Sequence, residues 1–163
     1  MHFTSFIISS GMAVSYVVMF FLIPFLFTNK TPSSKNLSAG SIIFILFSSF
    51  ASYLLADLFP SEFWGNRFLH TFGGGFLAYL TCYLATKDSK VHIRRAQFFV
   101  LSFLVVIALG NVNEVFEFIL HNTTNIVFAE TINDTWLDLC CNIIGALVAA
   151  LIFTPNIKYS RHE

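Results

Sequence analysis

Charged residues are scarce in this sequence, where Asp, Glu, Lys and Arg together make up only 11% of the 163 residues. A soluble domain carries about 25% charged residues, so a soluble fold built from this chain would lack an ordinary polar surface. Cysteine is limited to Cys82, Cys140 and Cys141, all inside apolar stretches, and neighbouring cysteines rarely pair. We interpret the three as small packing residues, which argues against a disulfide framework or a cysteine metal site.

Several functional signatures are also missing. The chain has no phosphate-binding glycine loop, zinc finger or nucleic-acid motif, and we therefore expect no nucleic-acid partner. It has no internal repeat or low-complexity tract. No basic segment precedes the first apolar run, which continues for more than 20 residues, so we expect this run to be a retained membrane span rather than a signal peptide.

Apolar residues dominate what is present, at 56% of the chain with 21 phenylalanines. A membrane-spanning helix needs about 20 consecutive apolar residues, and five stretches are long enough. The sequence therefore predicts an all-α, polytopic transmembrane helix bundle that forms a single domain over residues 1–163 and contacts the lipid bilayer. The five predicted spans cover residues 6–27, 40–58, 67–85, 96–120 and 134–154.

The distribution of Lys and Arg predicts the orientation of these spans. With five spans, successive loops alternate between the two sides of the membrane, and Arg67 falls on the side opposite to every other basic residue in the loops. Cytoplasmic loops carry the excess of basic residues, so the N-terminus is predicted outside and the C-terminus in the cytoplasm of a multi-pass plasma (inner) membrane protein. The predicted cytoplasmic group is Lys30, Lys35, Lys87, Lys90, Arg94, Arg95, Lys158 and Arg161.

Residues 110–121 place two carboxylates, Glu114 and Glu117, inside an otherwise apolar helical stretch. At about 100° per residue, these two residues lie with Gly110 and His121 in an arc of roughly 60° on one helix face. An ionisable residue within a membrane span costs at least about 2.5 kcal/mol and is by default a functional-site hypothesis. The sequence thus predicts a polar site on the fourth span, near its outer end.

Other polar residues fall at a similar depth near the outer ends of the third and fifth spans. The third span opens with Arg67 and His70, and the following Gly73, Gly74 and Gly75 predict the close approach of another helix. The predicted catalytic residues are Glu114, Glu117, His70 and Asp138, which are also the candidate ligands of a divalent metal. The predicted binding residues are Arg67, Asp134, Asn142 and Asn113.

Several interpretations of this constellation stay open. The carboxylates and imidazoles are suitable ligands for a divalent metal, or they act as acids and bases on a substrate reached from the outer leaflet. Alternatively, the residues form a charge-paired network that fixes helix packing in a structural or partner-binding subunit. A small transporter or ion-coupled carrier is a further alternative, and the sequence does not decide whether the protein is an enzyme.

Four segments together resemble the VanZ-like and YjdF-like families of small bacterial membrane proteins. Segment 66–70 reads Asn-Arg-Phe-Leu-His before a glycine-bearing span, and segment 113–117 reads Asn-Glu-Val-Phe-Glu. Segment 134–138 reads Asp-Thr-Trp-Leu-Asp and leads to Asn-Ile-Ile-Gly at 142–145. The resemblance covers roughly residues 57–150 and includes neither His121 nor the Cys140–Cys141 pair, so it implies no role for them.

The resemblance implies a cell-envelope location, because VanZ-like proteins are associated with glycopeptide (teicoplanin) resistance. YjdF-like proteins lack an assigned activity, so the resemblance implies site residues more than a reaction. The function that we expect is the binding or modification of a lipid-linked or other amphiphilic envelope molecule at an outward-facing acidic and histidine-containing site.

Overall fold

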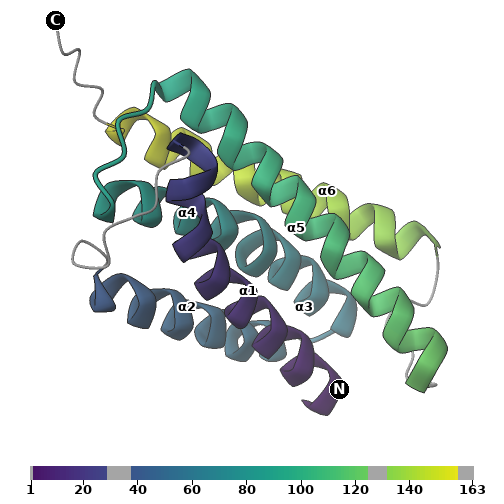
Figure 1. The fold of residues 1–163 in the computed structure, drawn as a ribbon. Coiled ribbons are helices and arrows are strands. Elements are labelled where there is room, and N and C mark those ends of the chain that lie inside the picture. The colour runs from purple at the N-terminus through teal and green to yellow at the C-terminus, as the bar shows by residue number, and fades with distance from the viewer. Residues whose placement is uncertain (1, 29–37, 125–131, 158–163) are drawn as a thin grey trace, which may run out of the picture.

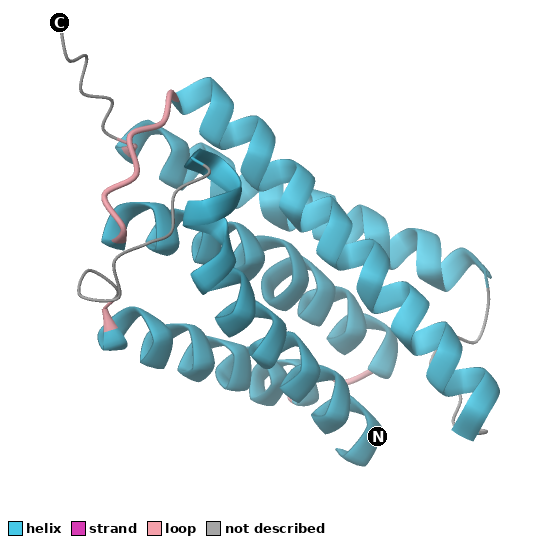
Figure 2. Cartoon of the chain, in the orientation of Figure 1, coloured by secondary structure: helices cyan, strands magenta, loops and turns pink. Residues whose placement is uncertain are grey.

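The computed structural model describes residues 2–28, 38–124 and 132–157, and this part of the chain is built of helices without strands (Figures 1 and 2). Apolar runs adopt helices in a membrane because each helix satisfies its own backbone hydrogen bonds. The elements are α1 (His2–Thr28), α2 (Ala39–Asp57), α3 (Glu62–Phe68), η2 (Leu69–Phe76), α4 (Leu77–Asp88), α5 (Arg95–Thr124), α6 (Ile132–Phe153) and η3 (Thr154–Asn156).

Four of these helical stretches are each long and apolar enough to cross a membrane: Ser10–Phe27, Ala39–Asp57, Arg95–Thr124 and Asn133–Asn156. They correspond to the first, second, fourth and fifth predicted spans. The third predicted span lies in the continuous helical path formed by α3, η2 and α4, which changes from α to π geometry and back. The protein is therefore an all-α transmembrane bundle, whereas the orientation of its termini stays a prediction.

One predicted boundary is wrong. The third span is predicted to begin at Arg67, but α3 already begins at Glu62. Ser61 caps this helix, because its hydroxyl group accepts a hydrogen bond from the backbone N–H of Trp64 at 3.4 Å. Because α3 begins before Asn66 and Arg67, both residues lie within a regular helix, and the helix determines the direction in which their side chains point.

The helices pack into one bundle, and the N-terminal end of α1 and the C-terminal end of α6 lie at opposite ends of it (Figure 1). The core lies between the helices and includes the fully buried Phe20, Tyr79, Cys82 and Phe98. Phe98 packs edge-on against Tyr79, with ring centroids 5.6 Å apart. All three cysteines are free; Cys82 is buried, as expected of a packing residue, whereas Cys140 is exposed and Cys141 is half-buried.

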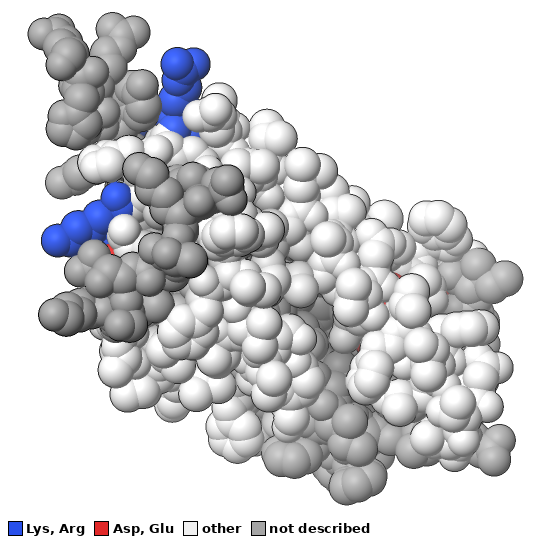
Figure 3. Space-filling model, in the orientation of Figure 1, with Lys and Arg blue, Asp and Glu red and all other residues white. Residues whose placement is uncertain are grey.

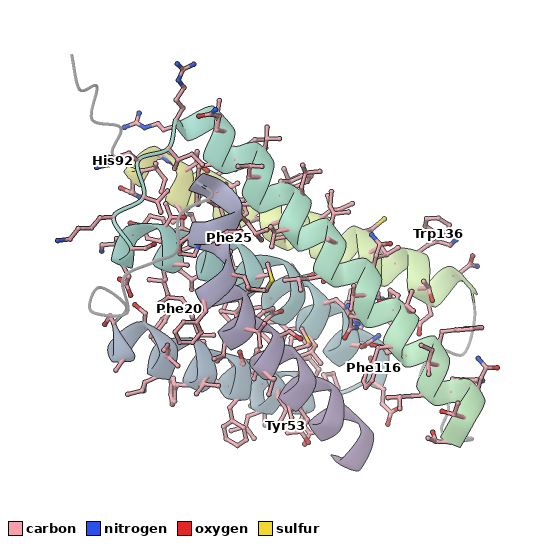
Figure 4. All side chains as sticks on the ribbon, in the orientation of Figure 1. Phe20, Phe25, Tyr53, His92, Phe116 and Trp136 are labelled. Atoms are coloured by element: carbon pink, nitrogen blue, oxygen red, sulfur yellow. The ribbon has the colours of Figure 1, made fainter. Side chains whose placement is uncertain are left out.

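The outer surface of the helices is apolar. Large side chains such as Phe47, Phe118 and Leu151 are each more than 60% exposed, and the face shown in Figure 3 is largely uncharged except for basic side chains at one end. Lys87, Lys90, Arg94 and Arg95 are exposed around the α4–α5 loop, where Figure 4 also places His92. This pattern is typical of a lipid-facing surface with a basic end; Lys30, Lys35, Lys158 and Arg161 lie outside the described residues.

The helices η2 and α6 pack so closely that their backbones are in contact. A Cβ atom added to Gly145 would overlap the carbonyl oxygen of Thr71, and one added to Gly75 would overlap the carbonyl oxygen of Asn142. The predicted close approach of another helix is found at Gly75, and α6 is the helix concerned. A Cβ atom on Gly74 would meet the side chain of Asn142, and one on Gly73 would meet side chains only, so the prediction is not met at these two positions. Small residues permit such packing, which brings the polar residues of η2 and α6 together.

Candidate functional site

Arg67 joins the two aspartates of α6. Its Nη2 donates a hydrogen bond to Asp134 and its Nη1 donates to Asp138, so that one guanidinium forms an ion pair with both carboxylates. Asn66 Nδ2 also donates to the two oxygens of Asp138, at 3.2 and 3.3 Å. The face of the guanidinium lies over the ring of Phe63, 4.8 Å from its centroid. The ion pairs of Arg67 thus join α3 to α6.

His70 lies between carboxylates of two different helices. Its Nε2 is 3.5 Å from Asp138 Oδ1 on α6, and its Nδ1 is 3.9 Å from Glu114 Oε1 on α5. One ligand atom from each of the three residues can be chosen so that all lie within 4.8 Å of one another. The side chains of His70, Glu114 and Asp138 are at most 8% exposed. We call these three residues the His70 triad.

Glu117 has a different neighbour. Its Oε1 accepts a hydrogen bond of 2.7 Å from Asn113 Nδ2, one turn earlier on α5. Glu117 is 6% exposed, so its carboxylate is buried like that of Glu114. The structure thus brings three of the four predicted catalytic residues into the His70 triad and pairs the fourth with the predicted binding residue Asn113.

Asn142 packs against glycines of two other helical segments. A Cβ atom on Gly74 would overlap its Oδ1, and a Cβ atom on Gly110 would lie 2.9 Å from its Nδ2. Asn142 is 4% exposed, and a side-chain hydrogen bond joins it to His70. Glu114 Oε1 is buried and accepts no hydrogen bond from the described residues. A buried polar atom without a partner costs about 1–3 kcal/mol, so this oxygen marks a place where a ligand would be stabilised.

A cavity of about 230 Å³ adjoins this polar region. His70, Asn113 and Asn142 supply hydrogen-bonding groups to its wall, and Met12, Leu109 and Phe116 are among its apolar lining residues. Phe116 and Trp136 lie toward the same end of the bundle, opposite to His92 (Figure 4). The other lining residues are Gly11, Ser15, Tyr16, Gly74, Gly110 and Val112.

The first helix contributes to this region, which the sequence did not predict. Tyr16 is 3% exposed, and its hydroxyl group donates to the carbonyl oxygen of Gly73 in η2 at 2.5 Å. This hydrogen bond ties α1 to the π-helical segment η2, and π-helical turns of this kind are frequent at functional sites. A tyrosine within an otherwise apolar run, five residues after Gly11, is the signal that could have indicated this contact.

The charges of the region do not balance. Glu114, Glu117, Asp134 and Asp138 are four carboxyl groups, whereas Arg67 is the guanidinium that pairs with two of them. Buried carboxylates require a cation, hydrogen-bond donors or a proton. The arrangement is therefore suited to binding a cation, to transferring a proton through His70 between two helices, or to holding three helices together.

Comparisons with known proteins identify a family but no characterised relative. No curated protein and no solved structure matches the chain. One family model matches residues 4–158, which covers all five predicted spans and every residue of the region described above. The chain therefore belongs to the family described as "Predicted membrane protein (DUF2238)".

Proposed function

We propose that the protein binds an amphiphilic molecule of the cell envelope in the cavity between α1, η2, α5 and α6. The cavity itself carries this proposal, because it combines an apolar wall with a few convergent polar groups. Sites for small molecules have this composition, with apolar contacts that supply most of the affinity and polar groups that fix the orientation.

Each part of the wall has a defined role in this proposal. Met12, Leu109 and Phe116 contact the apolar chain of the ligand. His70 and Asn142, which both line the cavity, hydrogen-bond to its polar group. Gly11 and Val112 are exposed at the surface of the bundle, so the apolar chain of the ligand reaches the cavity directly from the lipid.

The nature of the ligand is inferred from the orientation and from the family resemblance. The basic residues predict that the region around His70 faces the outer side of a plasma membrane. A VanZ-like or YjdF-like relationship would favour a lipid-linked or other amphiphilic envelope molecule. In a catalytic version of this function, His70 and Glu114 would act as acid and base on the polar group of the bound molecule.

Gly11→Phe is the variant that tests the proposal most selectively. A Cβ atom at Gly11 meets no other atom within 4 Å, and Gly11 lines the cavity. The phenyl ring therefore fills the cavity without displacing its neighbours, and removal of a helical glycine does not weaken α1. We expect the purified variant to remain folded but to lose most of the lipid that co-purifies with the wild-type protein, measured by mass spectrometry of lipids extracted after extensive detergent washing.

Val18→Phe is the matched control, because Val18 lies on the same helix, is 50% exposed and does not line the cavity. This variant should retain the wild-type amount of bound lipid. Equal lipid retention in Gly11→Phe and wild-type protein would refute the proposal, and so would a wild-type protein that carries no lipid after washing.

A further inference from the structure

We propose that the His70 triad binds one divalent transition-metal ion. Its members come from η2, α5 and α6, three helical segments separated in sequence, and each offers one ligand atom within 4.8 Å of the others. Metal–ligand bonds of about 2.0–2.2 Å place two ligand atoms about 3–4 Å apart. A bound ion therefore requires ligand atoms that now lie up to 4.8 Å apart to draw together by about 1–2 Å.

The surrounding residues orient the ligands as they do in metal sites. Asp138 accepts hydrogen bonds from Asn66 and Arg67, which hold its carboxylate in place. The imidazole of His70 faces a carboxylate at each nitrogen. Outer hydrogen bonds such as those to Asp138 hold ligating side chains in place in metal sites.

One observation other than the grouping itself indicates a ligand at this place. Glu114 Oε1 faces His70 Nδ1 at 3.9 Å, is buried, and accepts no hydrogen bond from the described part of the chain. A divalent ion would occupy the lone pairs of Glu114 directly and would offset the excess of carboxylates over guanidinium groups.

The donor set determines the class of ion. One imidazole and two carboxylates are ligands of Zn²⁺ and related divalent transition metals, whereas Mg²⁺ favours sites made of oxygen ligands and water. Three protein ligands leave at least one position open for water or for the polar group of a bound molecule. The metal site does not depend on the proposed amphiphile, because two of its ligands, Glu114 and Asp138, are not among the lining residues of the cavity.

Zn²⁺ alone is the probe for this site. The protein, purified without a polyhistidine tag and stripped of metal by a chelator, is dialysed against Zn²⁺ with excess Mg²⁺ and analysed by inductively coupled plasma mass spectrometry. We expect about one Zn²⁺ per chain for the wild-type protein and a loss of bound Zn²⁺ in Glu114→Gln and Asp138→Asn. The matched control, Glu117→Gln, removes a buried carboxylate three residues along the same helix, outside the triad, and should retain the ion.

The proposal is overturned if the wild-type protein binds no Zn²⁺ under these conditions, or if Glu117→Gln loses as much Zn²⁺ as Glu114→Gln. If a triad variant does not fold, X-ray absorption at the zinc edge of the wild-type protein identifies the ligand atoms of the bound ion instead. It should report nitrogen and oxygen ligands, whereas sulfur ligation would assign the ion to the cysteines of α6 and refute the triad site. Loss of lipid in Gly11→Phe with zinc retained would separate this inference from the proposed function.

Discussion

At the scale of single residues, position in a helix decides the partner of each acidic side chain. Glu114 and Glu117 are chemically equivalent and three residues apart, yet Glu114 faces His70 while Glu117 accepts a hydrogen bond from Asn113. The sequence predicted that both lie on one polar stripe of α5 because helical periodicity fixes the face of a residue. It could not assign their partners, because these depend on the rotation and depth of η2 and α6 relative to α5.

Arg67 supplies the residue-level prediction for stability. Replacing Arg67 by Met leaves Asp134 and Asp138 without their cation, and breaking a buried pair in this way costs about 3–5 kcal/mol of the free energy of unfolding. We expect Arg67→Met to unfold at a markedly lower temperature than the wild-type protein in the same detergent. Lys87→Met is the control, because Lys87 is exposed at the opposite end of the same helical path. Equal unfolding temperatures for the two variants would show that the ion pairs do not hold α3 and α6 together.

At the scale of elements, hydropathy predicted the helices well and their packing poorly. The apolar runs correspond to α1, α2, α5 and α6 within a few residues, because the membrane requires both length and apolar composition. The π geometry of η2 and the contact of Tyr16 with Gly73 were not predicted. Both depend on how helices distant in the sequence fit together, which periodicity alone does not report.

Glycine substitutions test the close backbone contact between η2 and α6. A Cβ atom on Gly145 would overlap the backbone of Thr71, which cannot rotate away as a side chain could. We expect Gly145→Ala to destabilise the protein by about 1–3 kcal/mol, as overpacking does elsewhere, and to lower the yield of folded protein. Gly11→Ala introduces the same methyl group where no atom lies within 4 Å and should leave both quantities unchanged. The α6–η2 packing is incorrect if both variants behave like the wild-type protein in size-exclusion chromatography and thermal unfolding.

At the scale of the whole molecule, the His70 triad with its neighbour Arg67 and the exposed basic residues of the α4–α5 loop occupy different ends of the bundle. Arg67 lies near the start of the helical path 62–88, and Lys87 lies near its other end. A path of this length is about 40 Å long at 1.5 Å per residue, enough to cross the hydrocarbon core. The prediction that the His70 triad faces outward therefore rests on the distribution of Lys and Arg and on an odd number of spans.

The measurement that tests this architecture most directly uses two insertions of a reporter that is active only outside the cytoplasm. One insertion follows Lys90, in the basic α4–α5 loop, and the other follows Thr124, at the end of α5. The account predicts an inactive reporter after Lys90 and an active reporter after Thr124, because α5 crosses the membrane between them. The same activity at both positions would contradict the five-span bundle, and the reversed pattern would place the His70 triad on the cytoplasmic side.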